Sequence, residues 1–160
     1  MECLEQQRPK KAATMLPDQP GGASPPAPGR QSADPGRAMI GVLIVEDDFL
    51  VGMQSESALA EAGFDVVGIA TTAEEALELA RQHHPLLAVM DIRLVGHRDG
   101  IDAAGELFRE LGIRCVFATA HDDQRTRERA ELFAPLGWLA KPYTMASLVA
   151  AVQKATSPTD

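Results

Sequence analysis

The sequence has few cysteines and no long apolar run. Only two of its 160 residues are cysteines, Cys3 and Cys115, which is too few for a disulfide framework or a thiolate metal site. No apolar stretch approaches the roughly 18 residues that span a bilayer, and the N-terminus lacks the apolar core of a signal peptide. These absences predict a cytoplasmic protein with no membrane segment.

An excess of basic residues is also absent. Lysine and arginine number 15 against 23 aspartates and glutamates, which gives a formal net charge of -8. Proteins that hold nucleic acid neutralise its phosphates with clustered basic side chains, so this balance excludes an ordinary DNA-binding surface. We therefore expect no direct DNA binding.

Proline is unevenly distributed along the chain. Residues 1–38 contain seven of the eleven prolines, with Gly, Ala, Gln and Ser between them and almost no large apolar side chains. Such a segment cannot bury enough surface to offset the entropy of ordering it, so it is predicted to be a disordered extension. The remaining residues, 39–157, suffice for one domain with a hydrophobic core.

Short apolar runs alternate with helical patterns from residue 40 onward. Uninterrupted apolar runs are typical of parallel strands buried on both faces. Thr72, with Glu75 three residues later, has the spacing of a capping box, and Thr144 is a candidate N-cap of the last helix. The predicted strands are 41–45, 64–70, 86–90, 114–118 and 137–140, and the predicted helices are 49–62, 72–84, 101–111, 123–133 and one from Thr144. This order predicts the α/β class, with a five-stranded parallel sheet in a doubly wound (βα)5 arrangement.

Polar residues follow four of the five predicted strands. They are Glu46 and Asp47 after the first strand, Asp91 after the third, Thr119 after the fourth and Lys141 after the fifth. In open parallel sheets the ligand lies beyond the carboxyl ends of the strands, so these groups should converge. Clustered carboxylate oxygens suit Mg²⁺, and we expect Glu46, Asp47 and Asp91 to bind it. With that charge neutralised, Asp91 could act as the nucleophile toward a phosphoryl donor.

Four segments at these strand ends resemble the signature blocks of response-regulator receiver domains, which have a flavodoxin-like fold. The resemblance covers residues 40 to about 156. The segments are Leu43-Ile44-Val45-Glu46-Asp47-Asp48, Val89-Met90-Asp91-Ile92-Arg93-Leu94, Ala118-Thr119-Ala120 and Lys141-Pro142-Tyr143. The resemblance implies that Asp91 is the phosphorylated residue, that Thr119 is the switch hydroxyl, and that Lys141 contacts the phosphoryl group. It also implies a cis Lys141-Pro142 peptide.

The chain departs from the usual receiver pattern at two places. The loop 93–100 lacks the proline common there and is slightly longer, which resembles a subgroup often found as single-domain regulators. Trp138 stands where receivers usually carry a Tyr or Phe that rotates during switching. By the same resemblance, Arg93 and His121 occupy positions that tune the lifetime of the phosphoryl group.

The resemblance implies a stand-alone response regulator of a two-component phosphorelay. We expect phosphorylation of Asp91 by a sensor histidine kinase or histidine phosphotransfer protein, and no enzymatic activity beyond its own phosphoryl transfer and dephosphorylation. The chain ends soon after the predicted last helix, so the output should be binding to a downstream protein or to a second copy in a homodimer. Arg125 and Arg129 on the predicted fourth helix are candidates for that docking surface.

Three other functional classes are alternatives to a response regulator. A haloacid-dehalogenase-type phosphatase needs a second acid two residues after its nucleophile, where this chain has Arg93. A flavodoxin-like flavin carrier needs a phosphate-binding loop after the first strand, where Glu46 and Asp47 would repel phosphate. The remaining alternative is a receiver fold used as a constitutive interaction module or phosphate sink.

Overall fold

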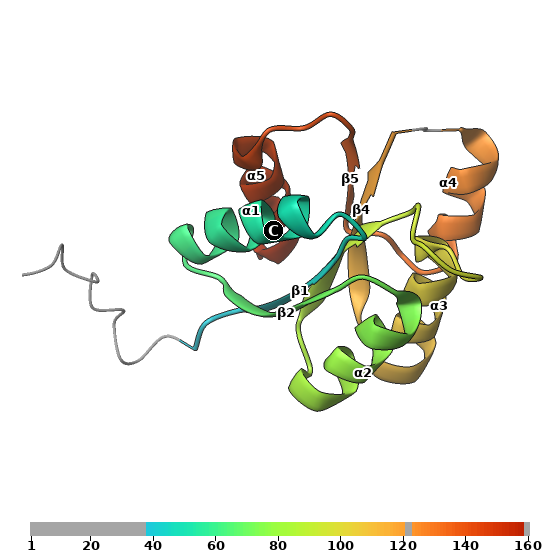
Figure 1. Cartoon of the computed structure of the whole chain (residues 1–160), viewed down its shortest axis with the longest axis horizontal. Coiled ribbons are helices and arrows are strands. Elements are labelled where there is room, and N and C mark those ends of the chain that lie inside the picture. The colour runs from blue at the N-terminus through green and yellow to red at the C-terminus, as the bar shows by residue number, and fades with distance from the viewer. Residues whose placement is uncertain (1–37, 121–122, 159–160) are drawn as a thin grey trace, which may run out of the picture. The chain divides into compact units, whose positions relative to one another are not determined.

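The computed structural model describes residues 38–120 and 123–158, in which five strands alternate with five helices (Figure 1). The predicted disordered extension, 1–38, falls outside this part of the chain except for residue 38, so it stays a prediction. The strands are β1 (Gly41–Val45), β2 (Asp65–Ala70), β3 (Leu87–Asp91), β4 (Arg114–Thr119) and β5 (Gly137–Ala140). The helices are α1 (Phe49–Glu61), α2 (Ala73–His83), α3 (Gly100–Leu111), α4 (Gln124–Glu131) and α5 (Met145–Thr156).

All strand pairs are parallel, and the order across the sheet is β2-β1-β3-β4-β5. Residues 42–45 of β1 and all of β3 are buried, as expected of strands covered on both faces. The register pairs Val45 with Met90, and Asp91 with Ala118. The α/β fold class is therefore confirmed, and the ends of β1, β3 and β4 lie next to one another.

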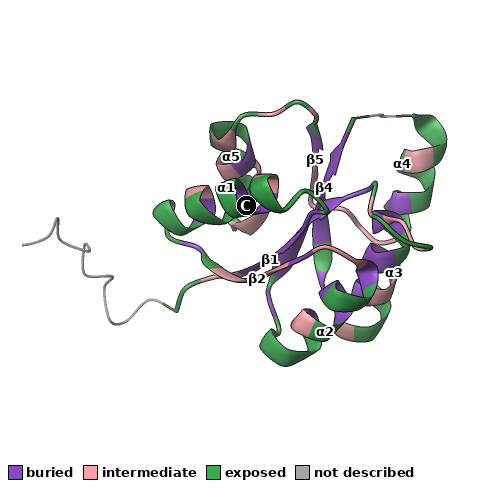
Figure 2. Ribbon diagram, in the orientation of Figure 1, coloured by how far each residue is buried: buried purple, intermediate pink, exposed green. Residues whose placement is uncertain are grey.

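The helices form two layers, one on each face of the sheet (Figure 1). Leu59 of α1 and Leu148 of α5 pack with Ile44 and Val89 on one face. Leu77 of α2 and Leu107 of α3 pack on the other face. Figure 2 shows the buried residues concentrated along the sheet and the inner helix faces. None of the helices in the described part of the chain is long and apolar enough to cross a bilayer.

Polar N-caps begin the helices, and several were identifiable from the sequence. Thr144 accepts a hydrogen bond from the Ser147 amide (3.1 Å), as predicted. The capping box predicted at α2 is only half correct. Thr72 accepts from the Glu75 amide (3.2 Å), but the Glu75 carboxylate bonds the amide and hydroxyl of Thr71 instead of returning to Thr72.

Several element boundaries differ from those predicted. The strands β3 and β4 each run one residue further, to Asp91 and Thr119, so both site residues belong to strands. The fourth helix is shorter than predicted, because Asp123 is its N-cap and Leu132 its C-cap. Leu132 is 74% exposed, so it adds no apolar anchor that would hold a longer helix against the sheet.

Candidate functional site

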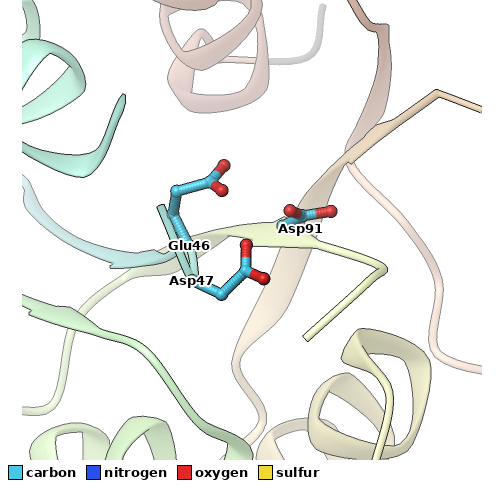
Figure 3. Close-up of side chains that lie close together, drawn as sticks. All are labelled: Glu46, Asp47 and Asp91. Atoms are coloured by element: carbon cyan, nitrogen blue, oxygen red, sulfur yellow. The ribbon is translucent and has the colours of Figure 1, made fainter. Parts of the chain in front are cut away.

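Three carboxylates meet where β1 and β3 end (Figure 3). Glu46 and Asp47 directly follow β1, and Asp91 is the last residue of β3. Glu46 and Asp91 are buried, and one oxygen from each of the three residues lies within 4.8 Å of the others. The predicted convergence of these side chains is thus observed.

Lys141 brings a positive charge from the other side of the site. Its Nζ donates to Asp91 Oδ2 at 2.9 Å and to Glu46 Oε2 at 3.2 Å. Lys141 follows β5, and its amide donates to the Thr119 carbonyl at 2.8 Å, which holds the β5 end beside the β4 end. The Lys141-Pro142 peptide is cis, as the resemblance implied.

Burial and neighbouring charges shift the pKa values of Glu46 and Lys141. Burial raises the pKa of Glu46 to about 7, and the negative charge of Asp91 adds to the effect while Lys141 opposes it. Burial alone would lower the pKa of Lys141, but hydrogen bonds and attraction from Asp91 and Glu46 raise it overall. Lys141 therefore stays cationic at neutral pH, but its charge does not fully offset the burial and repulsion that act on Glu46.

The donor set fits Mg²⁺. All three candidate ligands offer carboxylate oxygens, which Mg²⁺ prefers, and none offers sulfur or nitrogen. A divalent cation would also offset the repulsion from Asp91, which adds to the effect of burial on the pKa of Glu46. Asp48 is not part of this set, because its carboxylate caps α1 by accepting from the amides of Leu50 (3.0 Å) and Val51 (3.3 Å).

The loop after Asp91 is closed by a short backbone contact. The Gly100 amide donates to the Ile92 carbonyl at 2.7 Å, and the Arg93 amide donates to Asp91 Oδ1 at 3.0 Å. A Cβ atom at Gly100 would overlap the carbonyl oxygen of Asp91. Both ends of the loop 93–99 therefore lie next to Asp91, the candidate phosphorylation site.

Thr119 and Trp138 lie on neighbouring strands at the α4 side of the sheet. Thr119 is buried at the end of β4, where it pairs with Ala140 of β5. Trp138 pairs with Phe117, and the two rings stack with centroids 5.1 Å apart and an interplanar angle of 29°. The pair that contains Trp138 thus lies two residue pairs along the strands from the pair that contains the candidate switch residue Thr119.

A largely apolar cavity of about 440 Å³ opens beside the candidate site. Lys141 contributes the cationic part of its wall, next to the site carboxylates. The other lining residues come from α1, from the segments after β4 and β5, and from the first position of α5: Val51, Gln54, Ala120, Pro142, Tyr143 and Met145. Lys141 is therefore the residue that the cavity shares with the carboxylate site.

The structure does not test the predicted roles of two further residues, His121 and Arg129. His121 lies outside the described residues, so its tuning role remains a prediction. Arg129, predicted to lie on a docking surface, makes ion pairs within the molecule, to Asp99 and Asp102. Asp99 and Gly100 were not identified as functional from the sequence, although Asp99-x-x-Asp102 has capping-box spacing, and a full capping box is present there.

Comparison with known proteins agrees with this geometry. The family model of the response regulator receiver domain matches residues 42–153. The transcriptional regulatory protein PdtaR of Mycobacterium tuberculosis is 38% identical over 116 residues, covering 72% of this chain and 56% of PdtaR. The phyllosphere-induced regulator PhyR of Methylorubrum extorquens is 33% identical over 116 residues, covering 71% of this chain and 42% of PhyR. This chain therefore spans about half the length of these curated relatives.

A solved structure extends the similarity to the fold. The signal receiver domain of a modulated diguanylate cyclase from Desulfovibrio desulfuricans G20 superposes with a TM-score of 0.67 at 35% identity. The match covers 74% of this chain and 94% of that one. Family match, relatives and fold agree: the chain belongs to the response regulator receiver domain family.

Proposed function

We propose that the protein is a stand-alone, cytoplasmic response regulator that accepts a phosphoryl group on Asp91 in a Mg²⁺-dependent reaction. The observation that carries the proposal is the set of carboxylates around Asp91 with Lys141 Nζ 2.9 Å from Asp91 Oδ2. A sensor histidine kinase or a histidine phosphotransfer protein is the proposed donor, and a downstream protein or a second copy is the proposed receiver of the signal. Apart from its own phosphorylation and dephosphorylation, no catalysis is proposed, and no direct DNA binding.

In the proposed reaction, a carboxylate oxygen of Asp91 attacks phosphorus and the bond from phosphorus to the donor atom breaks. The donor leaves with the bonding electron pair, and Asp91 keeps the phosphoryl group as an acyl phosphate. When bound by Glu46, Asp47 and Asp91, Mg²⁺ would neutralise phosphoryl charge in the transition state. Lys141 would exchange its bond to the Asp91 carboxylate for one to a phosphoryl oxygen. The Thr119 hydroxyl would hold another phosphoryl oxygen.

The chemistry is tested by intact mass after incubation with acetyl phosphate and Mg²⁺. We expect one phosphoryl adduct, which disappears with a chelator and in Asp91→Asn. Asp65→Asn is the matched control, because Asp65 is exposed at the start of β2. Removal of the Lys141 charge in Lys141→Met should slow adduct formation by on the order of 10²-fold, since preorganised charge stabilises such transition states. An adduct that persists in Asp91→Asn would contradict the assignment.

A constitutive interaction module or phosphate sink is the second candidate. The stacking of Trp138 on Phe117 favours this second candidate, because a ring that is already packed against Phe117 would lose that contact by rotating. Trp138 is the single tryptophan of the chain, so its fluorescence separates the two functions. A switch predicts a change in emission on phosphorylation that is absent in Asp91→Asn. A phosphorylated protein with unchanged emission would favour the sink.

A further inference from the structure

The helix α4 has little apolar attachment to the rest of the domain. Of its eight residues, all of them described, Ala130 is the one that is buried. The rest are largely polar, and Figure 2 shows most of the helix exposed. Burial of one alanine side chain contributes little free energy, so other contacts must determine where this helix lies.

Arg129 ties α4 to the beginning of α3, which lies beside it (Figure 1). Its guanidinium bonds both oxygens of Asp99, at 2.8 and 3.2 Å, and one oxygen of Asp102 at 3.3 Å. Asp99 is also the N-cap of α3. Partial burial alone would raise the pKa of Asp99, but the bonds from Arg129 and from backbone amides hold it below its usual range. The bidentate geometry makes this the stronger type of ion pair.

The beginning of α3 is itself fixed to the phosphorylation-site candidate. Asp99 precedes Gly100, which lies against the carbonyl oxygen of Asp91 with no room for a side chain. The Gly100 amide also bonds the Ile92 carbonyl. Arg129 is therefore attached to a part of the molecule that packs directly against the Asp91 backbone.

Arg127 makes a second contact, on a different side of the helix. Residues two apart on a helix do not share a face, so Arg127 and Arg129 point in different directions. The guanidinium carbon of Arg127 lies 4.7 Å from the centre of the Trp138 ring, within cation-π range. Trp138 is stacked in turn on Phe117 of β4. One arginine of α4 thus contacts the candidate switch aromatic while the other holds the α3 start.

We propose that Arg129 anchors α4 to the phosphorylation-site loop and that Arg127 links α4 to Trp138, so that a movement of Trp138 shifts the helix about its anchor. Both arginines act as positioning residues, since neither touches Asp91. The anchor stands on the geometry of the unphosphorylated protein, whereas the signalling role of Arg127 rests on the proposed phosphorylation of Asp91. The docking role that the sequence suggested for Arg125 and Arg129 stays a separate prediction.

The anchor is tested by amide hydrogen exchange of α4 in the full, unphosphorylated chain. Arg129→Gln keeps a good helix former but removes the charge, and we expect about fivefold faster exchange of the α4 amides. Arg81→Gln is the matched control, because Arg81 makes a comparable exposed ion pair to Glu110 of α3 (2.6 Å) away from α4. Arg129→Lys should be intermediate, since lysine cannot make the bidentate bond. Equal α4 exchange in Arg129→Gln and Arg81→Gln overturns the anchor.

The link is tested by the change in α4 exchange after loading with acetyl phosphate and Mg²⁺, with loading verified by intact mass. Parent and Arg125→Gln should show the same change, and Arg127→Gln, although loaded equally, should lose most of it. A loaded parent with unchanged α4 exchange, or a full change in Arg127→Gln, overturns the link. A parent that does not load contradicts the proposed function and the link together, while the exchange of unphosphorylated Arg129→Gln still decides on the anchor.

Discussion

Gly100 is the residue at which the loop and the candidate site are most tightly packed. A methyl group there would overlap the carbonyl oxygen of Asp91, which is main chain and cannot turn away as a side chain could. We expect Gly100→Ala to lower the free energy of unfolding by about 2–3 kcal/mol. The steric overlap costs more than the better helix propensity of alanine contributes. Urea unfolding measures this loss of stability. Gly137→Ala is the control, because the nearest atom to a Cβ at that position is 4.0 Å away. Equal stability of the two variants would show that the loop relaxes easily.

Cys115 is a buried residue whose chemistry is suppressed by its surroundings. Burial raises the pKa of its thiol to about 12, so thiolate, the reactive form, is scarce at neutral pH. In a Cys3→Ser variant, Cys115 is the single cysteine of the chain. We expect negligible reaction with a thiol reagent at pH 8 in buffer and rapid reaction in urea, followed by absorbance. Rapid labelling of the folded protein would mean that β4 opens readily.

At the scale of single elements, α5 depends on its N-cap. Thr144 accepts from the Ser147 amide, and the helix buries Leu148 and Val152 against the sheet. Thr144→Ala removes the acceptor and should cost about 1 kcal/mol of unfolding free energy. Thr144→Ser keeps the hydroxyl and should stay close to the parent in urea unfolding. If the alanine and serine variants unfold alike, the cap contributes nothing measurable.

The elements themselves were predicted well where local signals were strong. Apolar runs identified all five strands, and Thr72 and Thr144 were identified as N-caps because short polar side chains there satisfy free amides. The prediction was less accurate for α4, because its polar sequence offers no apolar period that marks its end. The capping role of Glu75 was misassigned, since Thr71 lies equally within its reach.

At the scale of the whole molecule, the carboxylate cluster is assembled only by folding, so the Mg²⁺ site proposed there would be absent from the unfolded chain. A ligand that binds only the folded state stabilises it, by about 2.7 kcal/mol at a hundred times its dissociation constant. We therefore expect Mg²⁺ to raise the melting temperature in a thermal shift assay. Asp47→Asn removes one candidate ligand and should reduce the shift, whereas Asp65→Asn should not. An undiminished shift in Asp47→Asn would exclude that residue as a ligand.

The sequence by itself determined the order of strands and helices along the chain and which polar residues lie at the ends of four of the five strands. It did so because hydrophobic period and capping are local, and because parallel strands bring their carboxyl ends to one edge. Only the tertiary structure decided that Lys141 Nζ bonds Asp91, that Arg129 bonds Asp99 across 30 positions, and that Arg127 lies over Trp138. Such contacts depend on how separate elements pack and on which rotamers the packing allows, and neither is encoded in the period or spacing of a single segment.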